Sequence, residues 1–294
     1  MHFPGIIPAV ITPFTAADEV DVAGLQANAA HVLEHGARGL VAAGTMGEAG
    51  ALTGGERRTV IEAIVAQAGG GVPVLAGVSA GSTPGAVAYA ELARDAGVSG
   101  VMCLPPLNYR GRTDEYVAFY RAVAAAAQVP VMLYNNPEAS GVDLTPTLIA
   151  EIAAEVPEVV AVKECSGDAR RIAALVNATD LEILVGGDDW ALEGFAAGAT
   201  GWVSGVANVA PAECARLQEL VESGALAEAR AVYARLLPLS RLDMTPKLVQ
   251  YFKGALDAAG LHGGAVRPPR LALDAAERDV LRHAVAALGV PAAA

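Results

Sequence analysis

Eight short apolar runs, rich in β-branched residues, alternate along the chain with longer stretches of helical periodicity. The runs cover residues 5–14, 39–44, 72–78, 100–105, 129–134, 159–164, 182–187 and 201–205. Helices are expected between them at 21–35, 54–68, 84–96, 113–127, 145–154, 168–178, 189–197 and 211–222. Continuous apolar strands that alternate with helices are typical of parallel strands buried on both faces. Their number favours a closed (βα)₈ (TIM) barrel over an open doubly wound sheet, and the first run has no Gly-rich fingerprint after it.

Further helical segments follow the eighth repeat, for example at 227–240 and 246–260. No linker of low complexity separates them from the barrel. The sequence therefore predicts a catalytic barrel over residues 1–224 and a C-terminal helical region over 225–294 that packs against it. Within the repeats, Thr53 and Glu56 have the spacing of a capping box, and Thr145 and Asp168 precede apolar-periodic runs. Asp188 and Asp189 are expected to cap the helix that follows them.

Charge and composition exclude several classes of protein. The formal net charge is −12, whereas nucleic-acid binding needs clustered Lys and Arg. No apolar run is long enough to span a bilayer, and the first residues lack the pattern of a signal peptide. The three cysteines have neither disulfide-framework nor metal-knuckle spacing. A cytoplasmic protein that acts on a small molecule, without nucleic acid or membrane as a partner, is the expectation.

The end of the sixth run carries the sharpest chemical signal. Lys163 follows four apolar residues, 159–162, on a strand that should be buried on both faces. Lysine is rarely buried without a partner or a purpose. Burial lowers the pKa of an amine, so a partly neutral Lys163 could attack a ketone and form an imine. The alternative is a strand-end lysine that reaches solvent or pairs with an aspartate.

Other strand ends should meet Lys163, because the active sites of such barrels lie where the strands run into their βα loops. Tyr134 ends the fifth run and is either a core aromatic residue or a phenol that relays a proton. Thr45 follows the second run, between Gly44 and Gly47, and is either a turn residue or a hydroxyl in the same relay. These glycines, like Gly186 and Gly187 after the seventh run, let backbone approach a ligand closely.

Taken as a set, six segments are highly specific. They are GTMGE (44–48), LPP (104–106), YNNP (134–137), VKECSGD (162–168), GGDD (186–189) and GWVSGVANVAP (201–211). The chain resembles, over essentially its whole length, the dihydrodipicolinate synthase / N-acetylneuraminate lyase family. The resemblance implies a barrel with C-terminal helices, often a tetramer, and metal-free class I aldolase-type chemistry on pyruvate or a similar 2-oxo acid.

The resemblance also implies roles for single residues. Lys163 matches the imine-forming lysine and Tyr134 the catalytic tyrosine, while Thr45 and Met46 occupy the carboxylate-binding loop. Further substrate-binding positions would be Gly44, Asn108, Ala139, Gly186, Gly187 and Val206. A homodimer or homotetramer is expected, and because the lysine imine serves as the electron sink, no cofactor is expected.

Three positions depart from the synthase pattern. Ala139 stands where the synthase has an arginine that receives the second substrate's carboxylate. Asn108 stands at the relay tyrosine, with Tyr109 one step further on, and Met46 replaces a threonine. These changes favour a lyase that acts on a 2-oxo or imino acid by aldol cleavage, dehydration or deamination, rather than an efficient dihydrodipicolinate synthase.

Three alternatives remain open on the sequence alone. The chain could still be a true 4-hydroxy-tetrahydrodipicolinate synthase that uses pyruvate and aspartate semialdehyde. A metal-dependent class II aldolase would need converging His and carboxylate ligands, but His31 and His35 lie on the first predicted helix, outside the barrel mouth. A non-catalytic, ligand-binding barrel is disfavoured by the presence of Lys163, Tyr134 and Thr45 together.

Overall fold

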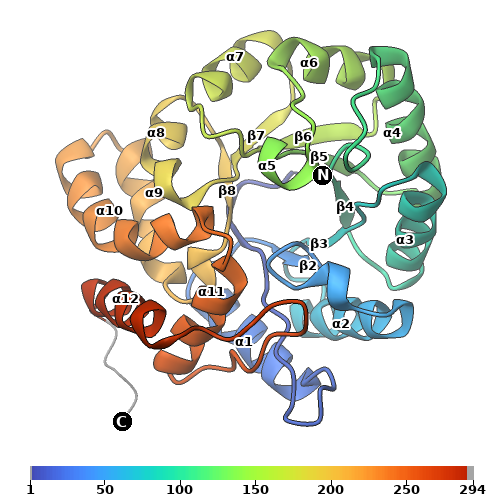
Figure 1. The fold of residues 1–294 in the computed structure, drawn as a ribbon. Coiled ribbons are helices and arrows are strands. Elements are labelled where there is room, and N and C mark those ends of the chain that lie inside the picture. Colours follow the sequence, from blue (N-terminus) through green and yellow to red (C-terminus); the bar gives the residue numbers. More distant parts are fainter. Residues whose placement is uncertain (1, 290–294) are drawn as a thin grey trace.

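Parallel strands and surrounding helices form a closed barrel, seen along its axis in Figure 1. The computed structural model describes residues 2–289. The strands are β1 (Gly5–Pro8), β2 (Leu40–Ala42), β3 (Val74–Gly77), β4 (Gly100–Cys103), β5 (Val131–Asn135), β6 (Val159–Glu164), β7 (Glu182–Val185) and β8 (Gly201–Ser204). Their order in the sheet is β1-β8-β7-β6-β5-β4-β3-β2, and a parallel bridge between Ala9 and Val41 joins the two edges. The predicted (βα)₈ barrel is confirmed.

An outer ring of helices covers the strands (Figure 1). The ring contains α1 (Val22–Glu34), α2 (Gly54–Ala68), α3 (Thr83–Asp95), α4 (Thr113–Ala127), α6 (Pro146–Glu155), α7 (Arg170–Ala178), α8 (Ala191–Ala196) and α9 (Pro211–Glu222). Short helices lie in the loops at α5 (Pro137–Ser140), η1 (Ala49–Ala51), η2 (Asp188–Trp190) and η3 (Val206–Asn208). The strands read as unbroken apolar runs because one face meets the barrel interior and the other meets these helices.

Two of the expected helix caps are confirmed. Thr53 and Glu56 form the reciprocal capping box of α2, and the Thr145 hydroxyl accepts a hydrogen bond from Leu148 N at the start of α6. The first apolar run, expected as a strand over 5–14, pairs as a strand only to Pro8. Beyond it, Ala9 and Phe14 form isolated bridges. Pro13 lacks the N–H that a continued ladder would need.

The chain after α9 continues as α10 (Leu226–Ser240), η4 (Arg241–Met244), α11 (Leu248–Ala258) and α12 (Ala275–Ala287). Figure 1 shows these helices on one side of the barrel, with α10 beside α9. The segment after α11 returns to the barrel, where Arg267 pairs with Asp18 and Glu56. Within residues 2–289, none of the helices has the length and apolar character needed to cross a membrane.

Candidate active site

A cavity of about 330 Å³ opens at the carboxyl ends of the barrel strands. Most strands contribute to its wall, and residues 243–248 of the C-terminal region cover it. The lining residues are Ala9, Gly44, Thr45, Met46, Met102, Tyr134, Asn136, Glu138, Ala139, Lys163, Cys165, Gly186, Val203, Gly205, Asp243, Met244, Thr245, Pro246 and Leu248. In barrels of this type, the carboxyl ends of the strands are where catalytic side chains gather.

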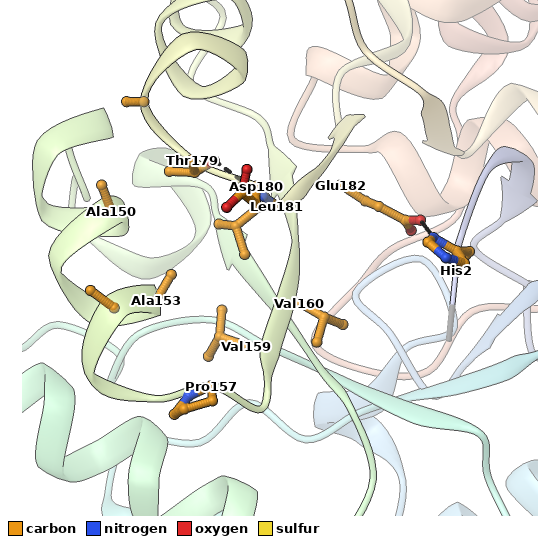
Figure 2. Close-up of a pocket in the computed structure, with 12 residues that line it drawn as sticks. His2, Ala150, Ala153, Pro157, Val159, Val160, Thr179, Asp180, Leu181 and Glu182 are labelled. Atoms are coloured by element: carbon orange, nitrogen blue, oxygen red, sulfur yellow. Dashed lines mark hydrogen bonds and ion pairs between the residues drawn. The ribbon is translucent and has the colours of Figure 1, made fainter.

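A second hollow, of about 520 Å³, lies at the opposite end of the barrel (Figure 2). Val159 and Val160 begin β6 beside it, and Glu182 begins β7 and pairs with the imidazole of His2. The remaining lining residues belong to α6, to the end of α7 and to the loops that follow these two helices (Figure 2). Its titratable side chains lie at the N-terminal face of the barrel, where residues of such barrels contribute to stability. We therefore assign the chemistry to the cavity that contains Lys163.

Lys163 and Tyr134 lie side by side in the cavity. They are direct partners in the pairing of β6 with β5, so both side chains point into the barrel. The Lys163 ammonium nitrogen lies 4.2 Å from the centre of the Tyr134 ring, and Lys163 is only 7% exposed. Gly186, on the neighbouring strand end, leaves room for the lysine: a Cβ there would come within 3.0 Å of Lys163 Cε. The lysine is therefore buried, but it faces a space that a small molecule can enter.

The pKa of Lys163 differs from the sequence-based expectation. Burial alone lowers the pKa, as expected, but Tyr134, Cys165 and Asp243 act in the opposite direction, and the pKa is raised above its usual value. Burial raises the pKa of the Tyr134 phenol and that of the Cys165 thiol, the latter to about 12. This direction favours the ammonium form of Lys163 in the free protein, contrary to the expectation of a partly neutral amine.

The Tyr134 hydroxyl is held by Asn136, whose side-chain nitrogen donates a hydrogen bond to it at 2.9 Å. Asn136 also caps α5, because its side-chain oxygen accepts from Ala139 N. Thr45 lines the same cavity, but within residues 2–289 no hydrogen bond joins its hydroxyl to that of Tyr134. Asn136 thus occupies the position beside the phenol that sequence reasoning gave to Thr45.

The structure brings together most of the residues singled out from the sequence, but not all. Lys163, Tyr134, Thr45, Gly44, Met46, Ala139 and Gly186 all line the cavity. Asn108 lies outside it, with a left-handed backbone and its N–H donated to Ser140 O. Gly187 packs against Trp190, and Val206 is buried behind the wall. His31 and His35 stack on each other on α1, away from the cavity.

Two carboxyl groups near Lys163 have different surroundings. Asp188 was expected to cap a helix, but it is fully buried and accepts hydrogen bonds from Trp202 Nε1 and from the backbone N–H groups of Gly205 and Val206. Its role is to hold the ends of β7 and β8 together. Asp243 belongs to η4, lines the cavity and lies close to the same Gly205.

Sequence reasoning missed Asn136, Glu138 and the cover formed by Asp243, Met244, Thr245 and Pro246. Asn136 belongs to the YNNP segment, two residues after Tyr134, and this spacing was a signal that the two side chains could meet. Residues 243–246 have no apolar periodicity and lie far from every strand end in the sequence, which gave no signal that they reach the barrel mouth.

Glu48 anchors the loop after β2 to the C-terminal region. This residue has a left-handed backbone, and its buried carboxylate lies 2.6 Å from the ammonium nitrogen of Lys253 on α11. The carboxylate also accepts from Arg267 N at 3.1 Å. The C-terminal region therefore holds the loop that carries Gly44, Thr45 and Met46.

Comparison with known proteins gives one consistent family. A model of the dihydrodipicolinate synthetase family matches residues 2–288. The chain is 34% identical to the 4-hydroxy-tetrahydrodipicolinate synthase of Methanopyrus kandleri, over 97% of this chain and 96% of that protein. It is 35% identical to the enzyme of the same name from Methanoculleus marisnigri, over 95% of this chain and 97% of that protein. The crystal structure of the chloride-inhibited dihydrodipicolinate synthase from Acinetobacter baumannii, complexed with pyruvate, aligns with a TM-score of 0.91 at 30% identity, covering 98% of this chain and 100% of that one.

Proposed function

The chain belongs to the dihydrodipicolinate synthetase family, whose members are pyruvate-dependent lyases of the class I aldolase type, and on that premise we propose how this member works. Lys163 forms an imine with the ketone of a 2-oxo acid, or takes up a cyclic imino acid through the same bond. The substrate then undergoes aldol cleavage, dehydration or deamination. We further propose that the chain is not an efficient dihydrodipicolinate synthase.

The observation that carries the proposal is the position of Lys163: buried, at the carboxyl end of β6, and facing a cavity beside Tyr134. A lysine that attacks a carbonyl must first lose a proton and must then release the carbonyl oxygen as water. The resulting imine withdraws electrons from the carbon chain of the substrate. This electron sink is supplied by the protein and substrate themselves.

Tyr134 would donate the proton that turns the carbinolamine oxygen into a leaving water. Its raised pKa keeps the phenol protonated, and Asn136 orients the hydroxyl. The substrate carboxylate would lie on the loop of Gly44, Thr45 and Met46, where backbone N–H groups and the Thr45 hydroxyl can donate to it. Gly47 permits this tight loop, since a Cβ there would meet Val10 O at 2.9 Å.

The distal half of the cavity supports a substrate without a second carboxylate. Among the residues that line the cavity, Lys163 is the one basic side chain, whereas Glu138 and Asp243 are acidic. Ala139 lines the wall where an arginine would be needed. Arg110 lies nearby, but its Nε donates to Gly141 O at 3.4 Å and it does not line the cavity. An unpaired carboxylate in such a site is unfavourable, whereas a hydroxyl or a protonated nitrogen would be stabilised.

A second candidate is the 4-hydroxy-tetrahydrodipicolinate synthase reaction, with pyruvate and aspartate semialdehyde as substrates. The names of the curated relatives favour it, since the proteins from Methanopyrus kandleri and Methanoculleus marisnigri both carry that name. It would require a cation for the semialdehyde carboxylate, and Arg110 would have to turn from Gly141 into the cavity to supply it.

Borohydride trapping tests the imine. Incubation with pyruvate and borohydride should add one reduced pyruvyl group per chain, and peptide mapping should locate it on Lys163. A label on Lys247 or Lys253 instead would show that the site has been assigned to the wrong lysine.

A substrate panel separates the two candidate functions. The panel contains 2-keto-3-deoxy sugar acids, 1-pyrroline-4-hydroxy-2-carboxylate, and pyruvate with aspartate semialdehyde. A missing hydrogen bond to a charged group is worth roughly 1.5–3 kcal/mol, which corresponds to about a tenfold to hundredfold loss in kcat/KM. We therefore expect the semialdehyde reaction to rank low. If it has the highest kcat/KM of the panel, the chain is a synthase despite Ala139.

A further inference from the structure

Asp243 introduces a carboxyl group into the cavity from outside the barrel. It belongs to η4, in the segment between α10 and α11, and lines the cavity together with Lys163. A Cβ on Gly205, in the cavity wall, would lie 3.5 Å from Asp243 Oδ1. Within residues 2–289, the Asp243 carboxylate has no ion pair within 4 Å. A half-buried carboxylate without such a partner is costly, so its presence beside Lys163 calls for an explanation.

The other carboxyl group at this place is already committed. Asp188 accepts one hydrogen bond from an indole and two from backbone N–H groups, and all of these belong to β8 or the turn after it. Of these two carboxyl groups, Asp243 is therefore the one that remains available to a substrate. The titratable groups that act on Asp243 or are affected by it are Lys163, Cys165, Tyr134, Asp188 and Asp189. On α11, packed against η4, Lys247 pairs with Glu277.

We propose that Asp243 is a catalytic acid–base residue, which removes the proton from the carbon next to the imine and returns it to the departing group. The proposal rests on the imine at Lys163. Lys163, which would bond C2 of the 2-oxo acid, and the cover formed by residues 243–246 line the same cavity, so the rest of the substrate lies in the space that the cover encloses. Asp243 is the acid–base group of that cover.

The step balances with this one residue. In the iminium form of the substrate, the Asp243 carboxylate takes one proton from C3, and the C3–H electron pair forms the C2–C3 double bond of the neutral enamine. The enamine then drives out the hydroxyl on C4: the C3–C4 double bond forms, the C4–O bond breaks, and the nitrogen again carries the positive charge. The protonated Asp243 gives its proton to the departing oxygen, which leaves as water. The carboxylate is regenerated, and the conjugated iminium can be hydrolysed.

The acid–base properties of Asp243 fit both halves of this step. Burial raises its pKa to about 6, although the positive charge of Lys163 acts in the opposite direction. A group whose pKa lies near the working pH is populated in both forms, which is the condition for giving and taking the same proton. By contrast, Tyr134 and Cys165 have raised pKa values and remain protonated, so neither is a ready base at neutral pH.

Pyruvate tests the first half of the step without knowledge of the natural substrate. In D₂O, the enzyme should replace the methyl protons of pyruvate with deuterium, which ¹H NMR follows directly. Borohydride trapping of parallel samples measures the imine, so the exchange rate can be divided by the trapped fraction. We expect Asp243→Asn to keep the trapping at Lys163 and to lower the normalised exchange by about 10²–10⁴-fold. The conservative Asp243→Glu should retain part of the exchange.

The pH profile and a matched variant complete the test. In the unmodified protein, the normalised exchange should rise as pH increases through about 6, where Asp243 becomes a carboxylate, and Asp243→Asn should lose this rise. Asp189→Asn changes a neighbouring carboxyl that does not line the cavity, and it should exchange close to the normal rate.

Three results would overturn the proposal, each in a different way. Normal exchange in Asp243→Asn, with trapping intact, would show that another group moves the proton. Loss of trapping together with exchange would make Asp243 only an electrostatic partner of Lys163. No trapping in the unmodified protein would remove the imine itself, and with it both the proposed function and the role of Asp243.

Discussion

Lys163 and Lys253 are both buried, with 7% and 1% of their surface exposed, but their surroundings differ. Lys163 ends a barrel strand and faces a cavity, and within residues 2–289 it has no ion pair within 4 Å. Lys253, on α11, lies 2.6 Å from Glu48 Oε1, donates to Ala265 O at 2.5 Å, and rests over the ring of Phe14. One lysine is surrounded by space for a ligand, the other by fixed partners.

The pKa shifts of the two lysines are also opposite. Burial dominates at Lys253 and lowers its pKa, although the hydrogen bond that Lys253 donates to Glu48 partly offsets this effect. At Lys163 the pKa is raised despite burial, and because Tyr134 and Cys165 stay protonated, the negative charge that favours the ammonium at neutral pH is that of Asp243. Burial of a lysine therefore does not by itself identify a nucleophile. The distinction lies in whether its partners are protein groups already in place or a molecule still to be bound.

The largest expected difference between the two lysines concerns the imine. Lys163→Ala should abolish borohydride trapping of pyruvate and turnover of the natural substrate, because no other amine of residues 2–289 lines the cavity. Its thermal unfolding should remain cooperative, since the strand is held by backbone pairing and by the Asn135–Glu164 contact. If Lys163→Ala still traps pyruvate as the unmodified protein does, another lysine forms the imine.

Tyr134→Phe sharpens the distinction between a residue of the site and one of the core. The change keeps the ring but removes the hydroxyl that Asn136 orients, so kcat should fall by about 10²–10⁴-fold with little loss of stability. Tyr120→Phe is the matched control: its buried hydroxyl bonds Cys103 O at 3.2 Å, outside the cavity. It should cost about 1 kcal/mol of stability and leave kcat unchanged. An unchanged kcat in Tyr134→Phe would make Tyr134 a core residue.

Lys253→Met should act on stability instead of chemistry. Removal of one partner from a buried ion pair costs about 3–5 kcal/mol, because the Glu48 carboxylate stays buried and keeps only the more distant Arg270, at 3.5 Å, as a counter-charge. Urea unfolding measures this loss, and pyruvate trapping at Lys163 should persist in the folded protein. Lys247→Met is the control, since its half-exposed pair with Glu277 should contribute about 0.2–1 kcal/mol. Equal losses of stability in the two variants would contradict the prediction that the buried Lys253–Glu48 pair matters more than the half-exposed pair.

A double variant adds the other partner of the same ion pair. In Lys253→Met/Glu48→Gln the buried carboxylate charge is removed together with Lys253, so the combined loss should be smaller than the sum of the two single losses. Additive losses would mean that each side chain acts through its separate contacts, such as those of Glu48 with Arg267 and Arg270.

How much the sequence could predict is visible in these same residues. The apolar runs predicted the barrel, because strands and their ends follow from local sequence pattern. The position of Lys163 at the end of one run predicted that it lies at the barrel mouth. Lys253 gave no signal, since Glu48 is distant in the sequence and only folding brings them together. Asp243 was missed and Asp188 was taken for a helix cap for the same reason. The oligomeric state and the roles of the site residues stay predictions.

The last prediction concerns the pH dependence of imine formation, and it follows from the raised pKa of Lys163. Attack on a ketone needs a neutral amine, and each pH unit below the pKa lowers the neutral fraction about tenfold, or about 1.36 kcal/mol. Because the pKa of Lys163 is raised, the initial rate of pyruvate trapping with cyanoborohydride should rise by up to about tenfold per pH unit from neutral pH upward. Measurement above the pKa of Asp243, which is about 6, keeps that carboxylate charged throughout. A rate independent of pH over this range would mean that burial prevails at Lys163 as it does at Lys253, leaving the amine already neutral in the free protein. The opposition between the two lysines would then rest on the presence of the cavity alone.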